Sequence, residues 1–230
     1  MTINARQHNM VKLIKSKERV SVKKLAETFY VSEMTVRRDL NELEKLGFVQ
    51  RYNGGAVYNG NEPIMPIKSR RRLHSDEKKN LSIQAKKYLH NSACIYIDSS
   101  STCSYIIPFI AEYKDVKIIT NSVYSLLCAS KYHIPCIIAG GTYFENDMCT
   151  VGNYTQDFLC GINPDVAFFS VLGISDDGII SDISCEQTAV RKTVMKNSAV
   201  NVFLLDSTKQ HKKYPYTVCK SEDADGIILI

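Results

Sequence analysis

The first part of the chain carries apolar residues at the spacing of three short helices. Stripes at i, i+3 and i+4 predict helices over residues 5–17, 22–29 and 33–46. Ser21 and Ser32 precede the second and third helices. Both are suitable N-cap residues, because a Ser hydroxyl can accept a hydrogen bond from the first turn.

Two short β-prone runs follow the third helix and meet at Asn53-Gly54-Gly55. Asn-Gly between such runs is the strongest short-range signal for a β-hairpin. Three helices and a hairpin make a winged helix-turn-helix, which we assign to residues 1–58. Residues 59–75 contain two prolines and several basic residues without periodicity, so we expect a linker there.

Apolar and amphipathic runs alternate through residues 76–230. The predicted strands are residues 93–98, 116–120, 134–141, 165–173, 199–206 and 225–230. The predicted helices are residues 76–91, 102–113, 123–132, 153–161 and 186–198. Pro108 is unexpected inside the second of these helices. Strands that alternate with helices imply right-handed crossovers and a mainly parallel sheet, so the fold class is α/β.

The composition is that of an ordinary soluble globular protein, with 44% hydrophobic and 23% charged residues. No apolar run reaches the roughly 18 residues that a membrane-spanning helix needs, so no membrane association is expected. The first residues are polar and lack the apolar core of a signal peptide. We therefore expect a cytoplasmic protein.

The eight cysteines and five histidines show no ligand spacing. No cysteine precedes residue 94 and none forms a C-x-x-C pair, which argues against a zinc finger and a redox motif. Several cysteines lie in apolar runs, where Cys packs as a small hydrophobic residue, and we expect reduced thiols. The sequence gives no reason to expect a metal or another cofactor.

Positive charge is concentrated near the N-terminus. Residues 1–58 hold eleven Lys and Arg against six Asp and Glu, a surplus of five that equals the net charge of the whole chain. A basic small domain joined to a nearly neutral larger one suggests a polyanionic partner. A solvated charged surface would give the same count.

The third predicted helix is suited to the major groove of DNA. The candidate DNA-contacting residues are Ser32, Thr35, Arg37, Arg38, Arg51 and Tyr52. Arg38 faces outward and could donate two bonds to a guanine edge, while Arg37 could contact a phosphate or pair with a carboxylate. Arg51 and Tyr52 are expected at the tip of the wing. The alternative is an amphipathic helix with a charged solvent face.

The carboxyl ends of the predicted parallel strands should meet in one crevice, where ligands bind in such sheets. The candidate ligand-binding residues are Asp98, Ser99, Ser100, Ser101, Thr102, Asn121, Gly140, Gly141, Gly173, Glu186, Arg191 and Lys209. A hydroxyl-rich loop before a helix can bind an anion, and glycines allow a close approach to the backbone. Capping loops, turns and surface ion pairs would explain the same residues.

Residues 20–57 closely resemble the DNA-binding signature of the DeoR family of repressors. That signature reads VS-x-x-T-[IV]-R-R-D-L-x-x-L-E-x-x-G and is followed by a wing ending in GGA. The matching residues are Val31, Ser32, Thr35, Val36, Arg37, Arg38, Asp39, Leu40, Leu43, Glu44, Gly47, Gly54, Gly55 and Ala56. Asn53 departs from the family, which usually has His there.

The remainder of the chain is similar to the DeoR sensor domain, which itself resembles ribose-phosphate isomerases. The matching positions are Asp98, Ser101, Thr102, Thr120, Asn121, Gly140, Gly141, Gly152, Asp165, Gly173, Gly178, Glu186, Val190 and residues 206–209. The resemblance implies that loop 98–102 holds a phosphate and that Lys209 neutralises charge nearby. Ser100 stands where the family favours Gly, and Arg191 stands where Lys is usual. The C-terminal extension common in the family is expected to be short.

These features predict a DNA-binding transcriptional regulator without catalytic residues, expected to repress genes of sugar metabolism. We expect a homo-oligomer, dimer or tetramer, on double-stranded operator DNA, with a phosphorylated sugar as effector in the crevice. One alternative is a sugar-phosphate isomerase with an attached DNA module, in which Asp98 or Glu186 is the base. Another is a repressor whose pocket binds a different ligand.

Overall fold

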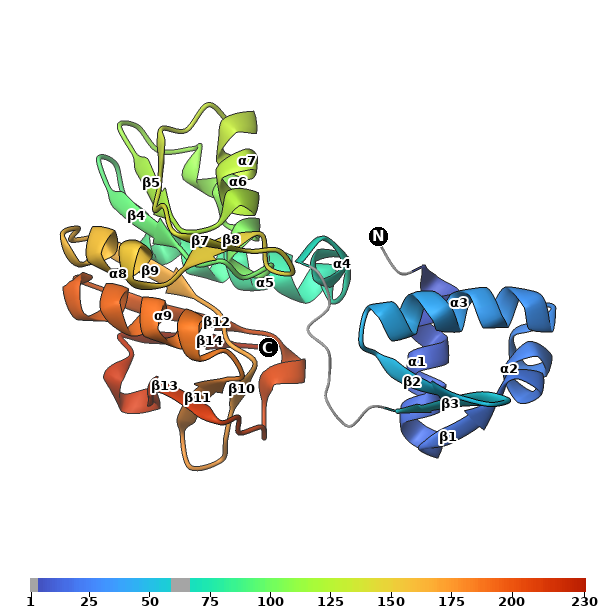
Figure 1. Cartoon of the computed structure of the whole chain (residues 1–230). Helices are drawn as coiled ribbons and strands as arrows, with labels where there is room; N and C mark the ends of the chain where they lie inside the picture. The colour runs from blue at the N-terminus through green and yellow to red at the C-terminus, as the bar shows by residue number, and fades with distance from the viewer. Residues whose placement is uncertain (1–3, 59–66) are drawn as a thin grey trace. The chain divides into compact units, whose positions relative to one another are not determined.

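The computed structural model describes residues 4–58 and 67–230, and the chain divides into two compact units, Met1–Ser69 and Arg70–Ile230 (Figure 1). Residues 59–66 of the expected linker lie outside the described residues. The rest of that segment contains a short helix, α4 (Ile67–Arg72), and the division between the units falls within this helix.

The N-terminal unit contains three helices and a small antiparallel sheet. The helices are α1 (Ala5–Lys17), α2 (Val22–Phe29) and α3 (Glu33–Lys45). The strands β1 (Arg19–Ser21), β2 (Val49–Tyr52) and β3 (Gly55–Tyr58) pair in the order β1–β3–β2. The three predicted helices and the hairpin are therefore confirmed. Strand β1 was not predicted, because three residues are too few to show an alternating pattern.

The predicted caps and apolar stripes form in this unit. Ser21 and Ser32 accept hydrogen bonds from the first turns of α2 and α3, each at 3.2 Å. The stripes meet in one core, whose largest fully buried side chains are Met10, Ile14, Leu25, Leu40 and Leu43. Helices of eight to thirteen residues are marginal alone in water, so this shared core is what stabilises them.

The second unit is built on a six-stranded parallel sheet. Its order is β14 (Gly226–Leu229), β12 (Asn201–Leu205), β9 (Val166–Phe169), β4 (Cys94–Ile97), β5 (Lys117–Thr120) and β6 (Cys136–Ile138). Each neighbouring pair is parallel. All six predicted strands contribute to this sheet, so the predicted α/β class is confirmed.

Helices cover both faces of the sheet (Figure 1). One face packs against α5 (Ser75–Ala85), α6 (Ile107–Ile110) and α7 (Val123–Lys131), and the other against α8 (Asn153–Cys160) and α9 (Cys185–Asn197). Successive residues of the central strands serve the two faces in turn. Ile95 and Ile97 belong to the first core, and Tyr96 belongs to the second.

Two predictions for this unit are wrong in detail. The predicted helix 102–113 is a 3-10 turn (Cys103–Tyr105) followed by the four-residue helix α6, with Pro108 in its first turn. Proline lacks an N–H and fits a first turn, so it ends the turn before it and starts a new helix. The predicted strand 165–173 stops at Phe169, because Gly173 belongs to a different sheet.

Two smaller sheets complete the unit and were not predicted. The strands β7 (Thr142–Phe144) and β8 (Cys149–Val151) form an antiparallel pair. The strands β10 (Gly173–Ile174), β11 (Ile179–Asp182) and β13 (Tyr216–Lys220) form an antiparallel sheet in that order. The turn between β7 and β8 and the end of β11 each carry a buried aspartate, Asp147 and Asp182.

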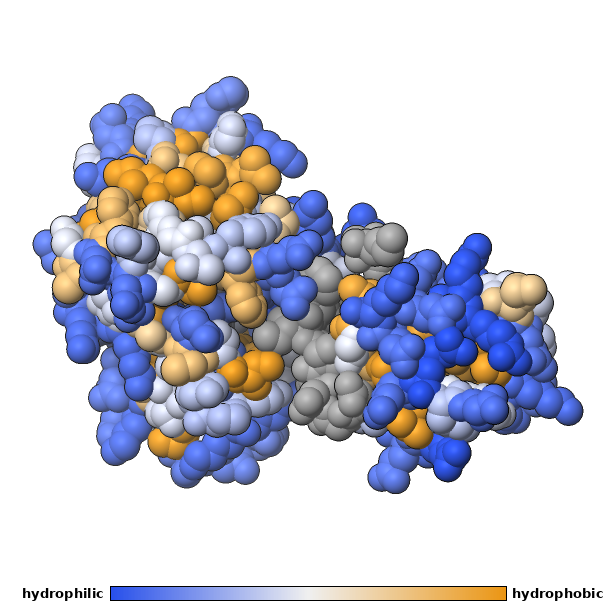
Figure 2. Space-filling view, viewed as in Figure 1, coloured by the Kyte–Doolittle hydropathy of each residue, from blue (hydrophilic) through white to orange (hydrophobic). Residues whose placement is uncertain are grey.

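Strand β6 is one of the two edge strands of the large sheet. Ile137 on this strand is 44% exposed, and Figure 2 shows hydrophobic side chains gathered on this part of the second unit.

All eight cysteines are free, and Cys160 and Cys185 are the exposed ones. Within residues 4–58 and 67–230, no helix is long and apolar enough to cross a membrane.

Candidate functional site

Helix α3 is fixed to α1 by a buried carboxylate. Arg6 Nε donates to Asp39 Oδ2 at 2.8 Å, and Gln7 Nε2 donates to Asp39 Oδ1 at 3.2 Å. The hydrogen bond with Asp39 raises the pKa of Arg6. Asp39 is 2% exposed, so this motif residue positions the helix and is not available to contact DNA.

The opposite side of α3 faces solvent near its N-terminus. The hydroxyls of Ser32 and Thr35 lie 3.0 Å apart, and Arg37 pairs with Glu33 at 3.3 Å. Arg38 is exposed, and no hydrogen-bond or ion-pair partner is found for it among the described residues. A charged, exposed side chain without a protein partner in the N-terminal half of such a helix is free to reach a base edge.

The wing turns at Asn53 and Gly54, and the two candidate residues of the wing, Arg51 and Tyr52, directly precede that turn. Arg51 donates its backbone N–H to Glu44 Oε1 at 2.7 Å and its guanidinium to Asn41. The Tyr52 ring lies 4.0 Å from the Arg19 guanidinium. Both residues therefore lie at the tip as expected, with Tyr52 paired to Gly55 directly before the turn, but their side chains already have partners in the protein. Arg51 is bonded to α3, and Tyr52 is stacked under a residue of β1.

Sequence reasoning missed two exposed apolar side chains beside α3. Tyr30, in the turn before the helix, is 95% exposed, and Met34, in its first turn, is 78% exposed. Both lie off the core stripe, and that is the signal that could have revealed them. Apolar groups at this position could contact thymine methyl groups.

A buried polar cluster lies at the carboxyl ends of the central strands of the second unit. Asp98 follows β4 and is 2% exposed. Its Oδ1 accepts from the backbone N–H of Ser99 at 2.6 Å, and its Oδ2 accepts from the N–H of Ser170 at 3.3 Å and from Arg191 Nε at 3.1 Å. Asp98 therefore joins the loop after β4 to the end of β9 and to α9.

Arg191 is the buried cation of this cluster. Its Nε, Nη1 and Nη2 donate to Asp98, to Asp182 at 2.9 Å and to Gln187 at 3.2 Å, and it is 3% exposed. Burial acts to lower the pKa of Arg191, but Asp98 and Asp182 outweigh it, and the pKa is raised. An arginine can satisfy three partners in these directions, whereas a lysine cannot reproduce that planar geometry.

A chain of hydrogen bonds leads from the loop to α4. Ser99 Oγ donates to Gln187 Oε1 at 3.3 Å, and Gln187 Nε2 donates to Asp147 Oδ2 at 2.6 Å. The other oxygen of Asp147 pairs with the Arg70 guanidinium. Sequence reasoning missed Arg70, Asp147, Asp182 and Gln187. Only the i, i+4 spacing of Gln187 and Arg191 on α9 hinted at a shared face.

Two lysines lie near Arg70. Lys78 Nζ donates to the carbonyls of Arg70 at 2.6 Å and Leu73 at 2.7 Å. Burial lowers the pKa of Lys78 to about 8, and the nearby Lys209 and Arg70 act in the same direction while Asp206 opposes them. Burial also lowers the pKa of Lys209, again against Asp206. An anion bound here would stabilise the charged forms of both lysines.

The other expected ligand residues lie in four different settings. Most of loop 98–102 is buried, with Ser100 Oγ accepting from Cys103 N at 3.0 Å. The Asn121 side chain is buried and bonded within the protein, because it accepts from Tyr96 Oη at 2.9 Å and donates to Thr150 O at 2.8 Å. Gly173 has no room for a side chain, because a Cβ there would lie 2.6 Å from Lys212 O. Glu186 is exposed and accepts from Ser184 Oγ at 3.1 Å.

The two glycines after β6 differ, and this difference gives a prediction. A Cβ on Gly140 would meet nothing within 4 Å, whereas one on Gly141, which has a φ of 151°, would collide with Thr155 Oγ1 and lie 2.8 Å from Val151 O. Gly141→Ala should cost about 1–3 kcal/mol of unfolding free energy. Gly140→Ala should stay within about 0.5 kcal/mol in the same urea denaturation. Equal costs would contradict the geometry.

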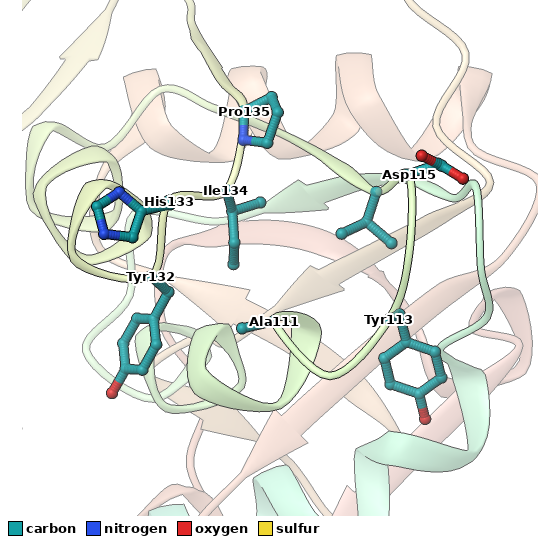
Figure 3. Close-up of a pocket in the computed structure, with 8 residues that line it drawn as sticks. Ala111, Tyr113, Asp115, Tyr132, His133, Ile134 and Pro135 are labelled. Carbon is teal, nitrogen blue, oxygen red and sulfur yellow. The ribbon is translucent and has the colours of Figure 1, made fainter.

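A pocket of about 290 Å³ lies at the opposite end of the sheet, at the amino ends of β5 and β6 (Figure 3). Its lining residues are Ala111, Tyr113, Asp115, Val116, Tyr132, His133, Ile134 and Pro135. This lining has a carboxylate and no Lys or Arg, so it does not suit an anion. The polar cluster at the carboxyl ends is the better candidate for a ligand site, because ligands of parallel sheets bind at that end of the strands.

Two family descriptions match the chain. "DeoR C terminal sensor domain" matches residues 73–229, and "DeoR-like helix-turn-helix domain" matches residues 6–62. The chain belongs to the DeoR family. The resemblance drawn from the sequence motifs is therefore confirmed, and this DeoR protein is a DNA-binding transcriptional regulator.

Curated relatives match most of the DeoR chain. The glycerol-3-phosphate regulon repressor of Escherichia coli is 26% identical over 207 residues, covering 89% of this chain and 81% of the relative. The L-fucose operon activator of Haemophilus influenzae is 26% identical over 215 residues, covering 91% and 85%. The relatives thus include both a repressor and an activator.

Solved structures resemble this DeoR protein in fold alone. The eIF2B delta protein of Chaetomium thermophilum has a TM-score of 0.50 at 11% identity, covering 97% of this chain and 70% of that one. A D-ribose-5-phosphate isomerase in complex with phospho-erythronic acid has a TM-score of 0.45 at 17% identity, covering 59% and 54%.

Proposed function

We propose that this regulator represses transcription by holding operator DNA through α3 and its wing, and that a phosphorylated sugar bound at the polar cluster controls this binding. The exposed Arg38 in the second turn of α3, free of any partner among the described residues, is the observation that carries the DNA-binding part. The name of the glycerol-3-phosphate regulon repressor supports a phosphorylated effector.

In the complex with DNA, the side chains of α3 and its wing differ in role: some contact bases or phosphates, and others position the elements. Arg38 reads a base edge in the major groove, and Ser32 and Thr35 contact phosphates or bases beside it. Arg37 contacts a phosphate after leaving Glu33. Arg51 holds the wing against α3, so that its effect on DNA binding is indirect.

At the effector site, loop 98–102 holds the phosphate and Lys209 neutralises part of its charge. Lys209 suits this role because it lies beside the end of β12 and carries a charge that burial disfavours. Arg191 has a different role from the direct contact expected from sequence. Its donors are taken by Asp98, Asp182 and Gln187, so it sets the shape of the loop.

The isomerase alternative gains no support from the cluster. A general base needs a carboxylate that can receive a proton from the substrate, and Asp98 is paired with Arg191 in a buried ion pair. Glu186, the other candidate base, is exposed and bonded to Ser184. We therefore propose a regulator without catalytic activity, which acts in the cytoplasm as a homo-oligomer with paired winged helix-turn-helix units.

Titration calorimetry tests the effector site directly. Glycerol 3-phosphate, ribose 5-phosphate and fructose 6-phosphate are titrated into the whole chain, with glycerol and ribose as unphosphorylated controls. We expect at least one phosphate to bind and Lys209→Ala to weaken it by about 10- to 100-fold, the loss of one charged hydrogen bond. Lys212→Ala, an exposed neighbour, should bind as the wild type does. Equal affinity in both variants would contradict the role of Lys209.

A further inference from the structure

The segment that leads from the first unit is anchored in the second unit by contacts of three side chains, those of Arg70, Arg71 and Lys78. The Arg71 guanidinium donates to Tyr124 Oη at 2.6 Å and lies 4.9 Å from the centre of the Tyr105 ring. Lys78 binds the carbonyls at the end of α4, and the Arg70 side chain pairs with Asp147. Because the division between the units falls within α4, these contacts fix the point where the chain leaves the sensor unit.

Two of these anchors connect with the proposed phosphate loop. Tyr105 ends the 3-10 turn that directly follows loop 98–102, and its hydroxyl donates to Arg71 O at 2.7 Å. On the other side, Ser99, Gln187, Asp147 and Arg70 form an unbroken series of hydrogen bonds. A displacement of the loop therefore reaches α4 through bonded neighbours and not through distance alone.

The charges at this point favour an exchange of partners. Arg70, Lys78 and Lys209 influence one another electrostatically, and Asp147 is the buried carboxylate that pairs with Arg70. Arg70 Nε is buried and has no hydrogen-bond partner among the described residues. A phosphate has more acceptor oxygens and more charge than a carboxylate, and it could satisfy Arg70 together with the lysines.

We infer that Arg70 belongs to the effector site, and that an anionic effector replaces Asp147 as its partner and thereby changes how α4 is anchored. Through Arg70, effector binding in the sensor unit then affects the segment that leads to the winged helix-turn-helix. This inference rests on the proposed function, because it assigns a regulatory contact to the same site.

Neutralising Asp147 tests the inference without any ligand. Asp147→Asn keeps the shape of the side chain but removes the ion pair with Arg70, so it should imitate the effector. In the whole chain, amide hydrogen exchange over residues 67–73 should rise at least tenfold, and operator affinity should change at least fivefold. Asp157→Asn, an exposed carboxylate on α8, is the matched control and should change neither. If Asp147→Asn folds and behaves as the control does, the inference is overturned.

A second variant guards against misfolding of the first. Arg70→Gln should abolish the shift in operator affinity that the three sugar phosphates cause, leaving less than a twofold change. Arg72→Gln, exposed on the same helix, should keep the full shift. A full shift in Arg70→Gln would contradict the inference. If no sugar phosphate binds the wild type, the proposed effector is wrong. The amide hydrogen exchange and the operator affinity of Asp147→Asn then still decide the role of Arg70.

Discussion

Replacing Arg191 with alanine is expected to lower the unfolding free energy of the sensor unit by about 3–5 kcal/mol. The reason is the pair of carboxylates left behind. Asp98 and Asp182 are both buried, and each is paired with this one guanidinium. Removing the cation leaves two uncompensated charges in a place that water does not reach, and this costs more than the lost contacts alone.

Urea denaturation followed by circular dichroism measures this cost. Lys192→Ala, the exposed neighbour on α9, should stay within about 0.5 kcal/mol of the wild type. Arg191→Lys should fall between the two, because it keeps the charge but loses the three-way donor geometry. A loss below about 1 kcal/mol for Arg191→Ala would contradict the account of the buried ion pairs.

Replacing Arg38 with alanine is expected to weaken operator binding by about 1–3 kcal/mol, which is roughly 5- to 150-fold. The side chain is exposed and does not contribute to the core, so the unfolding free energy should remain unchanged. Because a base contact carries sequence information, the variant should lose discrimination between operator and unrelated DNA.

Fluorescence anisotropy at fixed salt measures both affinities for Arg38→Ala. Lys45→Ala, exposed at the far end of α3, is the matched control and should change binding by less than Arg38→Ala does. A uniform loss on operator and unrelated DNA would show that Arg38 contacts only phosphate. Unchanged operator affinity would remove Arg38 from the reading surface.

The elements that sequence predicted well are those with a strong local signal. The three N-terminal helices carry apolar stripes and serine caps, and the six strands of the large sheet are short apolar runs. Gly173 shows where this fails, since an apolar run that continues past Phe169 does not reveal that the chain changes sheets. Pro108 was noticed, but its consequence depends on a turn of the backbone that periodicity does not report.

The candidate site was predicted only in part, because its polar residues are far apart in the sequence. Arg70 and Asp147 are separated by 77 positions, and nothing local marks either as half of an ion pair. Asp39 shows the opposite problem. It lies in the middle of a DNA-binding motif, yet its surroundings make it a structural residue.

The departure of Arg191 from the usual lysine now has a structural explanation. The sequence raised the concern that it changes a ligand contact. Its hydrogen bonds to Asp98, Asp182 and Gln187 instead indicate that it fixes the conformation of loop 98–102. In our proposal, the contacts with the ligand are then made by loop 98–102, Lys209 and Arg70.

The most direct test is operator binding by anisotropy in the presence of each sugar phosphate, using DNA from upstream of the protein's own gene at fixed salt. We predict that one phosphate shifts the affinity at least tenfold, about 1.4 kcal/mol of coupling, while its unphosphorylated sugar does not. Tight operator binding that no sugar phosphate alters would contradict the proposed sensor and leave only the reading head.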